Sequence, residues 1–158
     1  MTSQPNLPRI LQVGVRDVTF GKRVTIVEPS NLYECELGDD AFVGPFVEIQ
    51  KGVIIGRGCR IQSHSFICEL VEIGDDCFIS HGVRFVNDLF RRGGPAMGDT
   101  SLWLRTKVGD RVSIGTGAVV LPVEIASDTV IGAGAVVTKD IKKGGVYAGN
   151  PARFIRDL

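Results

Sequence analysis

The sequence predicts an all-β solenoid in which short strands and bends wind into stacked, three-sided coils. Three observations predict it. A large apolar residue recurs at every sixth position, a small or β-branched residue often follows four positions later, and glycine often comes directly after the apolar residue. Neither the 3.6-residue period of a helix nor the two-residue period of an ordinary strand fits this spacing. A short strand followed by a bend fits it, with one residue pointing inward and a smaller one filling the corner.

The six-residue register is the strongest of these observations. Its unbroken central run is Leu37, Val43, Ile49, Ile55, Ile61, Ile67, Ile73, Ile79 and Phe85. The register resumes at Val108, Ile114 and Val120, slips by one residue to Ile125, and continues through Ile131 and Val137. Upstream it runs back through Leu32 and Ile26 to Phe20, with a similar slip before Leu37. A coincidentally periodic β-sandwich would not hold this register for so long, so we expect a solenoid.

The other two observations complete the coil. The small residues are Ala41, Val47, Val53, Cys59, Ser65, Val71, Cys77 and Val83, and the glycines are Gly38, Gly44, Gly56, Gly74, Gly109, Gly115 and Gly132. Three strand-and-bend units make one coil of 18 residues, and each coil buries its inner face only against its neighbours.

Composition excludes several classes of function. The 158 residues fit one domain, and 18 basic against 18 acidic residues give no basic surface for a nucleic acid or an anionic membrane. Glycine and charged residues interrupt every apolar stretch, so no membrane span is expected. The first dozen residues lack the apolar core of a signal peptide. We therefore expect a cytoplasmic protein.

The four cysteines do not form a metal or disulfide framework. Cys35, Cys59, Cys68 and Cys77 contain no CxxC pair. The 18-residue coil places Cys59 and Cys77 one above the other and facing inward, where free cysteine commonly serves as core.

The register divides the chain into an N-terminal arm (1–12), a solenoid domain (13–141) and a C-terminal tail (142–158). An insertion at 88–107 interrupts the solenoid, with Asn87 and Asp88 at its root and the single tryptophan, Trp103, inside it. It is either a disordered surface loop or a loop that reaches a neighbouring subunit and closes a substrate pocket. In the tail, Asn150 as N-cap and Pro151 in the first turn predict a short helix that covers the end of the solenoid.

The repeat [LIV]-G-x-x-x-x with a small fifth residue resembles the hexapeptide-repeat acyltransferases over residues 13–153. The segments IQSHSFICE, HGVRFVND and GGPA are similar to those of N-acetyltransferases that act on nucleotide-linked 3-amino sugars. IGAGAVVTKD and GNPA are shared more widely and indicate acetyl-CoA. The resemblance implies a left-handed parallel β-helix, a homotrimer, and three active sites, each between adjacent subunits.

In that reaction a neutral sugar amine attacks the thioester of acetyl-CoA, and the residues expected to act on it lie near the insertion. His81 is the candidate base, directly or through water, and Asn87 is expected to bind the acceptor amine. Asp88, His64 and Trp103 are candidate substrate-binding residues. Each histidine could instead be a surface or interface residue, and catalysis could rely on positioning alone.

Acetyl-CoA is expected along the flat coils IGTGAVV and IGAGAVV. Gly115, Gly117 and Ala133 leave little side chain outside, so the pantetheine arm can follow the backbone there. Lys139, Lys142 and Arg153 are candidates for its phosphates, although each could be ordinary solvated charge.

Three alternatives stay open. The first is a hexapeptide O-acetyltransferase, or an acyltransferase for another small acceptor. The second is a non-catalytic scaffold, disfavoured because a scaffold has no need to interrupt its coils. The third is a zinc enzyme of the solenoid carbonic anhydrase type. Such enzymes use three histidines, whereas this chain has two. No metal is therefore expected.

Overall fold

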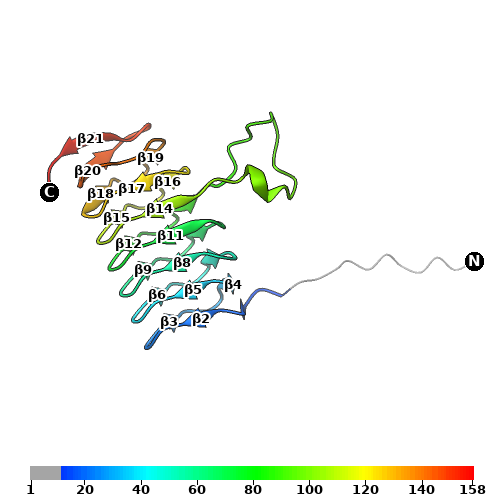
Figure 1. Ribbon diagram of the computed structural model, residues 1–158. Helices are drawn as coiled ribbons and strands as arrows, with labels where there is room; N and C mark the ends of the chain where they lie inside the picture. The colour runs from blue at the N-terminus through cyan, green and yellow to red at the C-terminus, as the bar shows by residue number, and fades with distance from the viewer. Residues whose placement is uncertain (1–11) are drawn as a thin grey trace, which may run out of the picture.

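The computed structural model describes residues 12–158 and contains three sheets, parallel except for the last strand, that form the sides of a β-solenoid of about seven turns. The coils stack along one axis, with the N-terminal end of the described chain at one end of the stack and the C-terminus at the other (Figure 1). This confirms the all-β solenoid, and the architecture is consistent with the left-handed winding that the resemblance implies.

Each sheet takes one short strand from every coil. Sheet A contains β1 (Val15–Arg16), β4 (Asn31–Tyr33), β7 (Glu48–Ile49), β10 (Phe66–Ile67), β13 (Arg84–Phe85), β16 (Val119–Val120) and β19 (Val136–Val137). Sheet B contains β2 (Thr19–Phe20), β5 (Glu36–Leu37), β8 (Ile54–Ile55), β11 (Val71–Ile73), β14 (Thr106–Val108) and β17 (Glu124–Ile125). Sheet C contains β3 (Thr25–Ile26), β6 (Phe42–Val43), β9 (Arg60–Ile61), β12 (Phe78–Ile79), β15 (Ser113–Ile114), β18 (Thr129–Ile131), β20 (Gly145–Ala148) and β21 (Arg153–Arg156).

The core is the column of apolar residues that the register predicts. All nine residues of the central run, from Leu37 to Phe85, are at most 2 % exposed, as are the eight small residues between Ala41 and Val83. Parallel pairing places equivalent residues over one another: Ile61 lies between Val43 and Ile79 in sheet C. Every coil therefore repeats the same contacts, which explains why the period is so strict.

The bends between sheets form three corners, which we name A–B, B–C and C–A by the sheets they join. All irregularities of the register fall at the A–B corner: the slip between Leu32 and Leu37, the slip between Val120 and Ile125, and the long insertion. The B–C and C–A corners keep a constant length through the central coils. Functional side chains placed on a regular corner therefore recur at fixed spacing along the chain.

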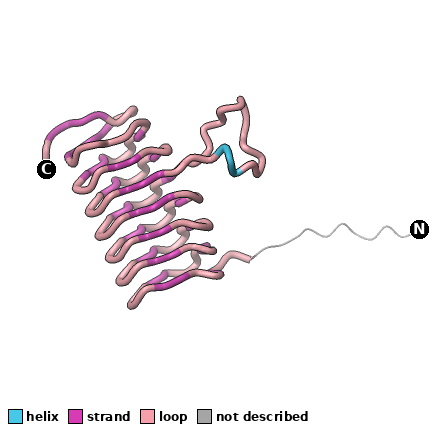
Figure 2. The backbone as a smooth tube through the Cα atoms, viewed as in Figure 1, coloured by secondary structure: helices cyan, strands magenta, loops and turns pink. Residues whose placement is uncertain are grey.

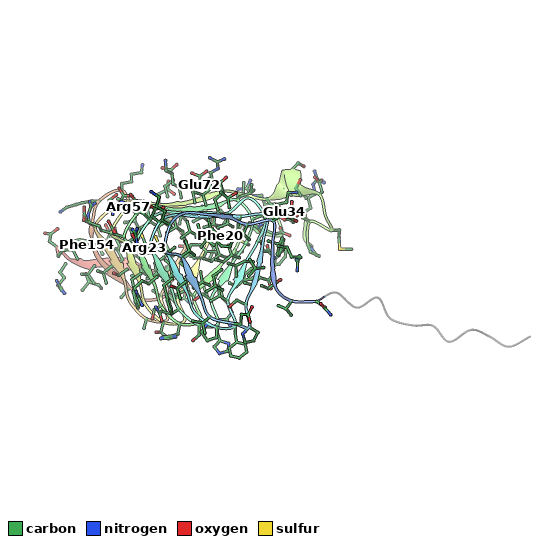
Figure 3. The ribbon with its side chains drawn as sticks, turned by 90° about the horizontal axis from the view of Figure 1, so that it is seen from below. Phe20, Arg23, Glu34, Arg57, Glu72 and Phe154 are labelled. Atoms are coloured by element: carbon green, nitrogen blue, oxygen red, sulfur yellow. The ribbon has the colours of Figure 1, made fainter. Side chains whose placement is uncertain are left out.

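Ion pairs link successive coils along the B–C corner. Arg23 binds Asp40 through two contacts of 2.6 Å, and Arg111 binds Asp128 at 2.7 Å. Figure 3 shows Arg23 and Arg57 at this edge of the coils and Glu34 at another edge. A hydrogen bond from Arg23 lowers the pKa of the Asp40 carboxyl. Exposed pairs of this kind contribute little free energy each, so the apolar column dominates stability.

The insertion leaves the coils as a projecting loop. It spans residues 86–105, two residues earlier at each end than the sequence predicts, and contains a 3₁₀ helix, η1 (Thr100–Leu102). Figures 1 and 2 show it extending outward from the stack. Its ends are held together by a hydrogen bond of 2.9 Å from Leu104 N to Asn87 O. The two ends of the loop therefore lie close together, as in a compact surface loop.

The predicted C-terminal helix is wrong. Residues 149–152 form a turn, and β21 returns antiparallel along β20 at the edge of sheet C. The edge of β20 offers unpaired backbone groups, and β21 satisfies them while Phe154 packs edge-on against Tyr147 at 5.5 Å. A helix of only seven residues would be marginal without such pairing.

Two further expectations concern the ends of the chain and membranes. The predicted N-terminal arm, 1–12, lies outside the described residues except for its last position. Within residues 12–158, no helix is long and apolar enough to cross a bilayer.

Candidate active site

Five predicted site residues lie along one edge of the solenoid, the C–A corner. They are His64, His81, Gly115, Gly117 and Ala133. Backbone hydrogen bonds tie each bend to the next: Gly82 N donates to Ser63 O at 3.0 Å, and Gly117 N donates to His81 O at 2.9 Å. We call the bend residues 45–46, 63–64, 81–82, 116–117 and 133–134 the C–A column. Its rigid backbone gives the side chains fixed positions.

His81 is the exposed residue in the centre of the C–A column. Its Nδ1 lies 2.8 Å from the hydroxyl of Ser63, one coil earlier. When Nδ1 carries the proton, Ser63 accepts it in a hydrogen bond and Nε2 presents a lone pair to solvent. That arrangement suits a general base.

Sequence reasoning missed Ser63 and Phe46, although a signal for both was present. Each precedes a histidine of the column by 18 residues, the length of one coil, so each lies directly beside it. The Phe46 ring stacks on His64 with ring centroids 4.9 Å apart and an interplanar angle of 13°. Residues that lie next to each other along this corner are one coil apart in the sequence. Counting one coil back from each histidine would therefore have identified both partners.

The glycines of the two flat coils play different roles. A Cβ on Gly115 would lie 2.5 Å from Ala133 N, so the missing side chain lets adjacent coils approach. Gly117 and Gly134 have φ of +70° and +66°, and a Cβ added to either would have no atom within 4 Å. Gly117, Gly134 and the exposed Ala133 thus leave an open strip of backbone. Gly115 belongs to the contact between coils and not to that strip.

Asn87 and Asp88 lie at the A–B corner, where the insertion begins. The side-chain Nδ2 of Asn87 donates to Glu69 O at 3.2 Å, which fixes the amide and leaves Oδ1 without a partner among the described residues. Both oxygens of Asp88 accept backbone N–H groups of the loop, from Phe90 at 2.9 Å and Ala96 at 2.7 Å. Asp88 therefore organises the loop, whereas Asn87 has an acceptor to offer.

A single chain does not bring His81 and Asn87 together. Strand β13 separates them, so His81 lies at the C–A corner and Asn87 at the A–B corner of the same coil. Their spacing of six residues in the sequence had indicated one cluster. Six residues, however, make one full side of the coil, which places them at its two ends.

Trp103 lies on the returning arm of the loop. It follows η1 and is half-buried, and its backbone N–H donates to Thr100 O at 3.2 Å. The loop carries three exposed apolar side chains, Leu89, Phe90 and Met97, of which Met97 is 89 % exposed. In a single chain these three side chains are exposed to solvent.

The three predicted phosphate-binding cations lie at different places. Lys139 is at the A–B corner, and Lys142 follows Ile141, which bridges to Ile125 of sheet B. Lys142 lines a groove of about 440 Å³ that also contains Lys107 and Asp140. Only Arg153 adjoins the C–A edge, directly after the turn at 149–152.

The prediction that Cys59 and Cys77 are core residues is confirmed. All four are free and buried, and the Cys59 and Cys77 thiols donate to Gly74 O and Gly109 O of the next coil. Burial raises the pKa of Cys35 to about 11 and that of Cys68 to about 12. Among residues 12–158, no group of three or more His, Cys, Asp and Glu side chains is arranged to hold a metal ion.

Two family models match the chain. Residues 34–69 match the bacterial transferase hexapeptide (six repeats), and residues 105–139 match the hexapeptide repeat of succinyl-transferase. Among curated proteins, a serine acetyltransferase from Mycobacterium tuberculosis is 39 % identical over 112 residues, which cover 69 % of this chain and 45 % of that protein. The bifunctional protein GlmU from Synechococcus is 24 % identical over 152 residues, covering 90 % of this chain and 33 % of that protein. The chain thus spans less than half the length of these two relatives.

Solved structures share the fold. AntD, an N-acyltransferase from Bacillus cereus in complex with dTDP and coenzyme A, superposes with a TM-score of 0.78 at 21 % identity, covering 90 % of this chain and 85 % of that one. A hexapeptide-repeat acetyltransferase from Vibrio cholerae, complexed with acetyl-CoA, gives a TM-score of 0.67 at 26 % identity and covers 77 % of this chain and 70 % of that one.

Proposed function

This chain belongs to the hexapeptide-repeat transferases, and we propose that it transfers an acetyl group from acetyl-CoA to the amino group of a nucleotide-linked amino sugar. The observation that carries the proposal is the C–A column, where the partnered imidazole of His81 stands beside an open strip of backbone. The similarity of HGVRFVND and GGPA to amino-sugar N-acetyltransferases supports the acceptor, and the AntD structure, with dTDP and coenzyme A, is a neighbour with the same fold.

The residues of the column suit acetyl-CoA. Gly117, Ala133 and Gly134 present backbone without bulky side chains, which a pantetheine arm can follow. Arg153 adjoins the same edge and has an exposed guanidinium for a phosphate. Lys139 and Lys142 lie at other corners, so we assign the phosphates to Arg153 first.

The chain's own residues have three tasks in the reaction. Asn87 accepts a hydrogen bond from the acceptor amine through Oδ1, which turns the nitrogen lone pair toward the thioester carbonyl. His81 Nε2 takes the proton that the nitrogen loses as the new amide forms, and the thiolate of CoA departs. Ser63 holds the imidazole in the orientation that exposes Nε2.

The separation of His81 from Asn87 favours a homotrimer with shared sites. In a ring of three subunits, the A–B corner and loop of one copy can face the C–A corner of the next, repeated three times. The exposed apolar residues of the loop, Leu89, Phe90 and Met97, would then gain a surface to cover. Asp88 would hold the loop in place, and Trp103 would line the acceptor side.

Subunit mixing tests the shared site. His81→Ala and Asn87→Ala would each be nearly inactive as pure proteins. In trimers co-folded from equal amounts of both, roughly a quarter of the sites would combine one intact His81 with one intact Asn87 from the neighbour. Recovery of about that fraction of wild-type activity supports the proposal. No recovery, or a fully active monomer by light scattering, contradicts it.

The acceptor is tested directly. Purified protein is incubated with acetyl-CoA and UDP- or dTDP-linked 3-amino sugars, and products are identified by mass spectrometry. The matched control is the same nucleotide sugar with a hydroxyl in place of the amine. N-acetylated product with the amine only is expected.

Relatedness to a serine acetyltransferase at 39 % identity favours one second candidate, O-acetyl transfer to a small hydroxyl acceptor. Serine is therefore included as an acceptor. Faster acetylation of serine than of the amino sugars would replace the first proposal with the second.

A further inference from the structure

The Phe46–His64 stack lies at the exposed surface of the C–A column. Phe46 is 56 % exposed, and its ring is almost parallel to that of His64, with centroids 4.9 Å apart. Both residues have positive φ, +60° and +64°, at the same position of successive bends. That backbone conformation projects the two side chains outward at one coil spacing, about 4.8 Å. The rings thus form a short ladder along the solenoid axis.

The ladder stops one coil later because its next position is Gly82. This residue has the same positive φ, +66°, but no side chain, and the nearest atom to an added Cβ is Arg84 Nη1 at 3.6 Å. Gly117, the following position, is also open. Within the described chain, the exposed His64 ring has one aromatic partner, Phe46, and on its other side the next position of the ladder, Gly82, has no side chain to cover it.

A cation stands beside this open position. Arg84 Nη1 donates to Gly82 O at 2.7 Å, which holds the exposed guanidinium near the corner. In sheet A its neighbours on the two adjacent strands are Phe66 and Val119, and no carboxylate forms an ion pair with it among the described residues. The guanidinium therefore has donors available for a phosphate.

We propose that Phe46 and His64 form a stacking platform for the nucleobase of the acceptor, with the base as the third member of the ladder above Gly82 and the diphosphate directed to Arg84. This inference rests on the proposed function, because it assigns the nucleotide end of that substrate. Every nucleobase offers a flat aromatic face, so the platform selects for a nucleotide without selecting strongly for one base. The two platform rings lie one coil before His81 on the C–A column, and the nucleobase would lie beside the His81 imidazole, over the glycine that follows it.

Isothermal titration with UDP, dTDP and CoA tests the platform in the full chain. His64→Ala removes the face that the base contacts and is expected to raise the Kd for UDP and dTDP about tenfold, an effect typical of losing one stacking contact. His64→Phe keeps a ring and should retain nearly wild-type affinity. Gly82→His places a side chain where the base would lie and should weaken binding at least as much as His64→Ala.

Three controls make the outcome decisive. Phe78→Ala removes an exposed ring from sheet C, away from the column, and should leave each Kd unchanged. Inorganic pyrophosphate has no base, so His64→Ala should not change its Kd, whereas Arg84→Ala should raise it. Circular dichroism melts verify that each variant is folded.

The possible failures are distinguishable. If the wild type acetylates nucleotide-linked amino sugars but His64→Ala binds UDP and dTDP normally, the platform is wrong and the proposed function stands. If His64→Ala weakens CoA alone, the platform holds the adenine of the donor, which also overturns the inference. If the wild type neither binds nucleoside diphosphates nor acetylates their amino sugars, both proposals fail.

Discussion

Replacing Gly115 with alanine tests whether the close spacing of adjacent coils, and not ligand binding, requires glycine directly after the inward residue Ile114. The new Cβ would lie 2.5 Å from Ala133 N and 2.8 Å from both Gly132 C and Ile131 O. Ordinary contacts of a Cβ are longer by roughly 1 Å. The coils must therefore separate locally, and the hydrogen bond from Gly115 N to Ile131 O, now 2.8 Å, must lengthen.

The expected cost is large because all the atoms in the way belong to the backbone. Overpacking of a rigid interior typically costs up to about 3 kcal/mol, and backbone has less freedom to move than a side chain. We therefore expect Gly115→Ala to lower the free energy of unfolding by about 3 kcal/mol. The assay is guanidinium unfolding followed by circular dichroism at matched protein concentration.

Two other glycines provide matched controls. Gly117→Ala meets no atom within 4 Å but requires φ of +70°, so it should cost about 1 kcal/mol. Gly94→Ala in the loop meets no atom and has no positive φ, so stability should stay the same or rise slightly. A Gly115→Ala protein as stable as Gly94→Ala would refute the argument, and weakened CoA binding with unchanged stability would return Gly115 to the ligand site.

Further predictions concern activity and pH. His81→Ala should lower kcat by a factor of roughly 10² at neutral pH. The loss should be smaller at high pH, where the acceptor amine is already neutral. A near-normal kcat would show that catalysis relies on positioning of the substrates and not on His81. Asn87→Ala should raise the acceptor KM and reduce kcat in steady-state assays, and an unchanged KM would remove it from the amine site. Arg153→Glu should raise the KM for acetyl-CoA while Lys142→Glu does not; equal effects would contradict the assignment to the C–A edge. Burial favours the neutral thiol of Cys35 over the thiolate. The contribution of this thiol to the free energy of unfolding is therefore complete below pH 9, and it is lost as the pH rises through the folded-state pKa of about 11. Cys35→Ala should reduce the alkaline loss of stability, measured by unfolding between pH 8 and 11.

The structure of the core was predictable because a solenoid repeats one local contact. Each inward residue, such as Ile61, packs against residues one coil before and after it, so the sequence period reports the packing directly. The same logic placed Cys59 and Cys77 in the interior. The C-terminal helix failed for the opposite reason. Residues 153–156 follow no repeat, and their conformation depends on the free edge of β20, which exists only in the folded chain.

In the candidate site, too, the repeat predicted the position of some residues, whereas other features were visible only in the folded chain. Counting along the repeat is enough to place His64, His81 and Gly117 on equivalent bends, because a regular corner returns at a fixed interval. The folded chain was needed to show that Asn87 lies a full side of the coil away from His81, that Asp88 is used by the loop, and that Phe46 stacks on His64. Backbone register is set by the periodic burial of apolar residues, whereas side-chain partnerships depend on which bends the winding places side by side.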